Sequence, residues 1–109
     1  MELKNKVSLV TGAGQGIGEG IAKVLASHGS KVMIVDLNGK SAMRVAQEIN
    51  LLFPNSAEYF EADLTDSNAI KSMMQATISK FTKLDCICNN AAASKGLGCL
   101  LYTSDAADE

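Results

Sequence analysis

A glycine-rich segment joins the first apolar run of the chain to the first helical pattern, and its spacing suits a diphosphate. It reads T-G-x-x-x-G-x-G and lacks the Gly-Lys-Ser/Thr of a nucleoside-triphosphate loop. Gly12 can form a tight turn with positive φ, Gly16 leaves room beside the main chain, and Gly18 lets the helix approach the sheet closely. Amides at the helix N-terminus then face the anion. We therefore predict a dinucleotide site in this loop, which also carries Gln15 and Ile17.

An acidic residue at the end of the next apolar run can select the dinucleotide. Asp36 lies 18 residues after Gly18, and its carboxylate can accept hydrogen bonds from both hydroxyls of an adenosine ribose. The same carboxylate repels a 2′-phosphate, and neither Gln15 nor Leu37 supplies a compensating positive charge. The expected cofactor is therefore NAD rather than NADP. By position alone Asp36 is equally a solvated turn residue before a helix, but the glycine loop favours the ribose-binding interpretation.

Apolar residues alternate between strand-like runs and helical spacing, which predicts the scaffold that must position these groups. Strands are expected at residues 7–11, 31–36, 57–62 and 84–89, with a helix after each of the first three. Asn38 and Thr65 are the expected N-caps of the second and third helices. Apolar strands that alternate with helices predict βαβ units and a parallel sheet covered on both faces.

The predicted fold class is therefore α/β: an incomplete doubly wound Rossmann fold, with a parallel sheet of order 3-2-1-4 and three helices. The first two helices are expected on one face of the sheet and the third on the other. This arrangement leaves a crevice between strands 1 and 4, and we expect a ligand at that switch point. The Met and aliphatic stripes of the helices are assigned to core packing.

Composition excludes several classes of protein. The 109 residues carry a net charge of −2 at pH 7, and the scattered basic residues leave no strip for a phosphate backbone, so no nucleic-acid partner is expected. No apolar run approaches the ~20 residues of a membrane span. The N-terminal residues show no signal peptide, which predicts a cytoplasmic protein. The three cysteines lack zinc spacing and His28 lies alone at a predicted helix end, so reduced thiols and no metal are expected.

The sequence resembles the short-chain dehydrogenase/reductase family over residues 2–95. Besides the glycine loop and Asp36, the resemblance rests on Asp63-Leu64 after the third strand and Asn89-Asn90-Ala91 after the fourth. Ala92 stands where the family usually has Gly, a departure that affects the expected backbone conformation there. A purely structural role for the two asparagines, in which they tie strand ends together, is an open alternative.

The resemblance implies a role for each matching residue. Asp63 is expected to accept a hydrogen bond from the adenine amino group, and the Leu64 amide to meet the adenine ring. Asn90 and Ala91 are expected to line the adenosine side of the site. Ile17 is expected to approach the nicotinamide.

The resemblance also implies an NAD-dependent oxidoreductase that interconverts a secondary alcohol and a ketone by hydride transfer. Its partners would be a small-molecule substrate and further copies of the parent protein in a homo-oligomer. The family's catalytic Ser and Tyr-x-x-x-Lys are missing here, because Tyr59 and Tyr102 have no Lys four residues later. We therefore predict no catalytic residue in this chain, which corresponds to the cofactor-binding half of the enzyme. A non-catalytic NAD-binding module and an inert structural remnant are the alternatives.

The last eleven residues differ in character from the rest. Residues 99–109 resemble a translated transposase-type sequencing adapter. The predicted division is thus an NAD-binding Rossmann half-domain at residues 1–98 and a non-native tail at residues 99–109. The alternative is a genuine acidic tail, and we expect disorder in either case.

Overall fold

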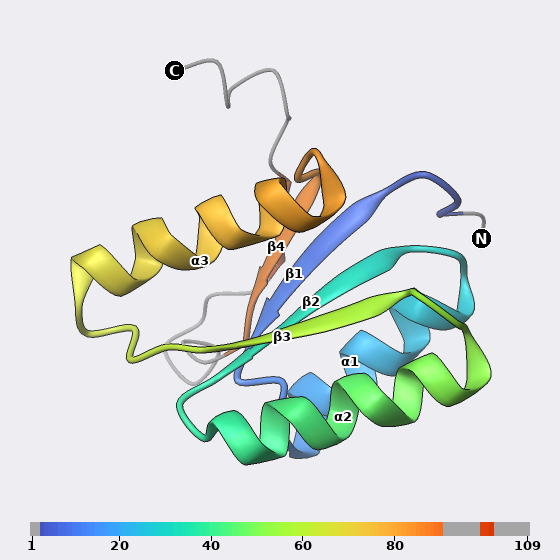
Figure 1. Ribbon diagram of the computed structural model, residues 1–109, viewed down its shortest axis with the longest axis horizontal. Helices are drawn as coiled ribbons and strands as arrows, with labels where there is room; N and C mark the ends of the chain where they lie inside the picture. Colours follow the sequence, from blue (N-terminus) through green and yellow to red (C-terminus); the bar gives the residue numbers. More distant parts are fainter. Residues whose placement is uncertain (1–2, 91–98, 102–109) are drawn as a thin grey trace.

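The computed structural model describes residues 3–90 and the backbone of residues 99–101. Strands and helices alternate as predicted (Figure 1). The elements are β1 (Val7–Thr11), α1 (Gly16–Ser27), β2 (Lys31–Asp36), α2 (Gly39–Leu52), β3 (Ala57–Glu61), α3 (Ser67–Phe81), β4 (Cys86–Asn89) and β5 (Cys99–Leu101). Two strands are shorter than predicted: β3 stops before Ala62, and β4 starts after Leu84, which is buried without belonging to a strand.

The sheet has the order β3-β2-β1-β4-β5, so the predicted 3-2-1-4 arrangement is confirmed. The first four strands run parallel, with β1 at the centre. Val10 of β1 pairs with Ile34 of β2 and with Cys88 of β4. All five residues of β1 are buried, as expected for a strand covered on both faces.

The fifth strand corrects one prediction. Residues 99–101 form β5, which pairs antiparallel with β4, so disorder beginning at residue 99 is wrong for these three positions. The last strand of a sheet carries N–H and C=O groups along its outer edge, and an extended segment that lies beside β4 provides partners for such groups. An antiparallel return needs only a short connection, whereas a parallel strand needs a crossover. The remaining tail, 102–109, lies outside the described residues, and its origin stays a prediction.

The helices cover the sheet unequally. As predicted, α1 and α2 lie on one face and α3 lies on the other (Figure 1). The first face holds a buried cluster that includes Val10, Ile34 and Val45. The opposite cluster includes Leu9, Met33 and, from α3, Met73. Within the described part of the chain, no helix is both long and apolar enough to cross a membrane.

The helix ends explain one correct and one incorrect cap prediction. The Asn38 side chain accepts a hydrogen bond from the Ser41 N–H and caps α2, as predicted. Thr65 does not cap α3, because its hydroxyl and its N–H both donate to the carboxylate of Asp63. Asp66 caps α3 instead, by accepting from the N–H of Asn68.

Candidate functional site

The glycine loop leaves β1 and enters α1 with two glycines in the left-handed region. Gly12 and Gly16 have φ values of 61° and 60°, which residues with a Cβ rarely adopt. A Cβ added at Gly16 would meet nothing within 4 Å, whereas one at Gly18 would lie 2.1 Å from the Gly12 carbonyl oxygen. The loop is therefore open beside Gly16, and Gly18 permits the close packing of helix against strand.

The start of α1 differs from the starts of the other two helices. Gln15 occupies the N-cap position, yet among the described residues its side chain bonds none of the helical N–H groups. In α2 and α3 the corresponding side chains, Asn38 and Asp66, do cap the helix. Free N–H groups in the first turn of α1 can therefore receive an anion. The neighbouring Ile17 side chain is 77% exposed, an unusual position for a large apolar residue in a helix.

Asp36 is held against the glycine loop rather than left in solvent. One carboxylate oxygen, Oδ2, accepts from the Gly14 N–H at 2.8 Å, and the other, Oδ1, accepts from the Asn38 N–H at 2.9 Å. The residue is half-buried at the end of β2. A carboxylate has about four acceptor positions, so each oxygen of Asp36 can accept one further hydrogen bond.

A pocket of about 290 Å³ opens at the carboxyl ends of β1, β2 and β3. Five residues singled out in the sequence border it: Gly12, Asp36, Leu37, Asp63 and Leu64. Its other lining residues are Val35, Ala62 and Thr65. The pocket lies on the β2 side of the switch point between β1 and β4, and the predicted ligand position at the switch point stays a prediction.

Asp63 is charged at neutral pH and faces solvent. The Thr65 hydroxyl donates to its Oδ1 at 2.7 Å, and the Thr65 N–H donates to the same oxygen at 3.0 Å. These two hydrogen bonds lower the pKa of Asp63 below its ordinary value. Asp63 is thus an ionised hydrogen-bond acceptor at the pocket edge.

The two asparagines at the end of β4 make contacts with the neighbouring strand. The Thr11 hydroxyl donates to Asn89 Oδ1 at 3.0 Å, and Asn90 Nδ2 donates to the Gly12 carbonyl oxygen at 3.2 Å. Both bonds tie β4 to the start of the glycine loop, as the structural alternative anticipated. Asn90 therefore adjoins the predicted site through Gly12, while Ala91 lies outside the described residues.

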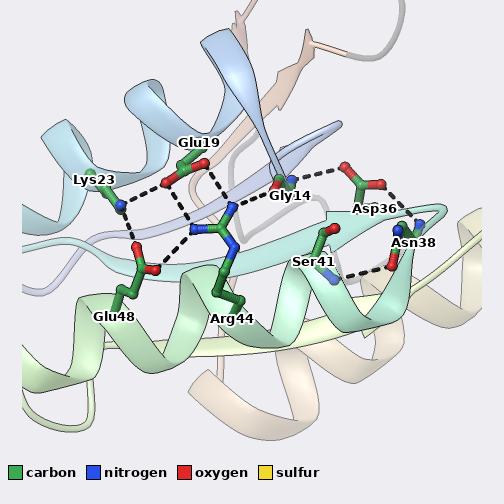
Figure 2. A network of polar contacts seen from close by, with 8 residues as sticks. All are labelled: Gly14, Glu19, Lys23, Asp36, Asn38, Ser41, Arg44 and Glu48. Atoms are coloured by element: carbon green, nitrogen blue, oxygen red, sulfur yellow. Dashed lines mark hydrogen bonds and ion pairs between the residues drawn. The ribbon is translucent and has the colours of Figure 1, made fainter.

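Several residues beside the loop were missed in the sequence. Gly14 is a free position in the loop pattern, but a Cβ there would lie 2.8 Å from Ser41 Cβ and 2.9 Å from Asp36 Cγ. Arg44 of α2 donates to the Gly14 carbonyl oxygen at 3.0 Å (Figure 2). The available signal was the i, i+4 spacing of opposite charges, which places Arg44 and Glu48 on one face of α2.

Arg44 belongs to a cluster of four charges that bridges α1 and α2, here called the four-charge cluster: Glu19, Lys23, Arg44 and Glu48. Glu19 is bonded by both cations, at 3.0 Å from Arg44 and 2.7 Å from Lys23. The hydrogen bonds from Arg44 and then from Lys23 lower the pKa of Glu19 to about 2. Within residues 3–90, no group of three or more His, Cys, Asp or Glu is placed to hold a metal ion.

Known proteins resemble this chain in sequence and in structure. Residues 6–108 match the family described as short chain dehydrogenase. Short-chain dehydrogenase reductase 5 of Arabidopsis thaliana is 33% identical over 99 residues, covering 91% of this chain and 37% of that protein. The mouse (Mus musculus) 15-hydroxyprostaglandin dehydrogenase, named as NAD(+)-dependent, is 33% identical over 95 residues, covering 86% of this chain and 35% of that protein. The likeness to the mouse enzyme is one of several of similar strength.

A solved structure agrees with these matches. The crystal structure of 3-ketoacyl-(acyl-carrier-protein) reductase from Brucella melitensis, complexed with NADH, superposes with a TM-score of 0.72 at 43% identity. The match covers 77% of this chain and 33% of that one. The chain thus spans little more than a third of the length of the curated relatives it matches.

Proposed function

Because the chain belongs to the short-chain dehydrogenase/reductase family, we propose that it is the NAD-binding portion of an oxidoreductase that interconverts a secondary alcohol and a ketone. The main support is the Asp36 carboxylate, which borders the pocket and is fixed by the N–H groups of Gly14 and Asn38. A fixed carboxylate suits two ribose hydroxyls and disfavours a 2′-phosphate.

The other residues of the site fit the remaining parts of NAD. Ionised Asp63 and the neighbouring Leu64 border the pocket, where they suit the amino group and the ring of adenine. The open space at Gly16 and the N–H groups of α1 suit the diphosphate. Exposed Ile17 and Leu37 offer apolar surface that a bound dinucleotide would cover.

The chain's own residues bind and orient the cofactor, and bound NAD would supply the hydride acceptor. Proton exchange with the substrate oxygen needs a further group, and neither Tyr59 nor Tyr102 has a Lys four residues later. We expect the chain alone to bind NAD without oxidising an alcohol. The parent protein would act on a small-molecule alcohol or ketone as a homo-oligomer.

A second candidate is a non-catalytic module that only binds NAD. Gly98 is the last residue before the predicted tail of residues 99–109, so the genomic DNA beyond its codon distinguishes the enzyme from the binding module. A reading frame that continues into a Ser and a Tyr-x-x-x-Lys supports the enzyme. A stop codon at that point supports the binding module.

Calorimetric titration of the 109-residue chain with NAD and with NADP tests the cofactor assignment. We expect NAD to bind at least ~10-fold more tightly, because the 2′-phosphate meets the Asp36 charge at partly screened contact distance. Circular dichroism of the same sample establishes that the protein is folded. Tighter binding of NADP, or no binding of either dinucleotide by the folded chain, contradicts the proposal.

A further inference from the structure

Gly14 is buried between two charged side chains from α2 and the end of β2 (Figure 2). Its N–H donates to Asp36 Oδ2 at 2.8 Å, and its carbonyl oxygen accepts from Arg44 Nη2 at 3.0 Å. Both polar backbone groups of this one residue are thus engaged by ionised partners. Hydrogen bonds to ionised groups are shorter and stronger than neutral ones.

Arg44 can hold the carbonyl because its own position is fixed. Its Nη2 also bonds Glu19 at 3.0 Å, and its Nη1 bonds Glu48 at 3.0 Å. The guanidinium is planar and presents its N–H donors as a rigid fork, so two carboxylates and one carbonyl define its orientation. Lys23 bonds the same two carboxylates, each at 2.7 Å, but within residues 3–90 it bonds neither Gly14 nor Asp36.

The Gly14 carbonyl belongs to the same peptide group as the Gln15 N–H. In a planar trans peptide these two groups point in opposite directions. A carbonyl held toward Arg44 on α2 therefore directs the Gln15 N–H away from α2. The Gly14 N–H that donates to Asp36 lies in the preceding peptide group, which is joined to this one at the Gly14 Cα.

We propose that Arg44 is a positioning residue for the dinucleotide. It holds the carbonyl of Gly14 while the N–H of the same residue, in the preceding peptide group, binds Asp36, so the two contacts together fix the Gly14 backbone that places Asp36 for the ribose hydroxyls. This role rests on the proposed function, since it presumes that Asp36 receives the ribose. The Arg44 side chain itself need not contact the ligand.

The decisive comparison is between Arg44→Met and Lys23→Met in the full 109-residue chain. Each variant removes one cation from the four-charge cluster and one bridge between α1 and α2, but only Arg44→Met removes the bond to Gly14. We expect NAD to bind about 5-fold more weakly to Arg44→Met, the effect of one lost hydrogen bond. Lys23→Met should change the affinity less than about 2-fold. The two variants should lose a similar amount of thermal stability.

Hydrogen exchange of the Gly14 amide gives a second readout that does not depend on NAD. The Gly14 amide should exchange at least ~10-fold faster in Arg44→Met than in the unmodified chain. In Lys23→Met its exchange rate should be unchanged. Equal effects of the two variants on affinity and exchange would reduce Arg44 to a bridge between helices and overturn the proposal. If the unmodified chain binds no NAD, the proposed function fails, and the Gly14 exchange still decides whether Arg44 positions the loop.

Discussion

The Asp36 carboxylate combines a charge with a fixed position, so a substitution there should shift the preference of the chain from NAD toward NADP. Asp36→Arg replaces the group that repels a 2′-phosphate with one that can bind it in a bidentate manner. We expect the ratio of NADP to NAD affinity to rise by at least ~10-fold in calorimetric titrations. Glu58→Arg makes the same charge change on β3, outside the residues that line the pocket, and should leave the ratio unchanged. An unaltered ratio in Asp36→Arg would contradict the assignment of Asp36 to the ribose.

Two glycines near each other in sequence should respond in opposite ways to a methyl group. In Gly14→Ala the new Cβ would lie within 3 Å of both Ser41 and Asp36, so α2 or the carboxylate must shift. We expect a loss of about 1–3 kcal/mol in unfolding free energy, as in other overpacked sites. Gly20→Ala adds a methyl to an exposed position of α1 with nothing within 4 Å, and should gain up to ~1 kcal/mol. Urea unfolding at pH 7 measures both, and equal effects would show that Gly14 is not constrained.

The residues found in the sequence and those missed differ in a physical way. The positions of Gly12 and Asp36 could be predicted from local rules, because a tight turn needs positive φ and Asp36 ends a strand beside the glycine loop. The role of Gly14 depends on how closely α2 approaches the loop, which no local pattern specifies. Arg44 lies 30 residues from its partner Gly14, so its charge pairing could be predicted along the helix but its contact with the loop could not.

The bridge between α1 and α2 should give the stability of the chain a defined dependence on pH. Glu19 has a pKa of about 2 in the folded chain, against an ordinary value of 4.5. Its stabilising contribution is therefore complete above about pH 4.5 and is lost as the pH falls toward about 2. The urea concentration at the midpoint of unfolding should therefore decrease steadily as the pH is lowered from about 4.5 to about 2.

Glu19→Gln tests whether this carboxylate is responsible. We expect it to lower the unfolding free energy by roughly 1 kcal/mol at pH 7 and to flatten the acid dependence. As a control, Glu58→Gln removes a carboxylate that lies 3.7 Å from Lys80 of α3. This variant should keep the pH dependence of the unmodified chain. If Glu19→Gln loses stability toward low pH as steeply as the unmodified chain, groups other than Glu19 control the acid dependence of the stability.

The regular elements could be predicted because the strands are apolar throughout and the helices carry apolar stripes. The errors occur where a second partner, either a close neighbour in sequence or a distant strand, competes with the expected signal. Thr65 is a good N-cap by type, but Asp63 binds its hydroxyl and leaves the cap to Asp66. The segment 99–101 has no strand pattern of its own, and it becomes a strand by pairing with the outer edge of β4.

The two faces of the sheet are covered to different extents, which bears on the stability of the whole chain. On the face of α1 and α2, the cluster residues Val32, Ile34 and Ile49 are almost completely buried. On the opposite face, where α3 is the only helix among the described residues, Phe60 and Ile87 are half-buried. Relatives are nearly three times as long as the matched segment, and we expect their additional residues to cover this face.

The isolated chain should therefore be marginally stable and prone to aggregate. Leaving a few hundred Å² of apolar surface in water forfeits on the order of 5 to 10 kcal/mol at ~25 cal/mol per Å², which is comparable to the whole stability of a domain. Deleting residues 99–109 removes β5 and exposes the edge of β4, so the shortened chain should unfold at lower urea and form larger species in size-exclusion chromatography. A sharp two-state transition with ordinary domain stability, from a monomer that is unaffected by the deletion, would refute this expectation and show that α3 alone covers its face sufficiently.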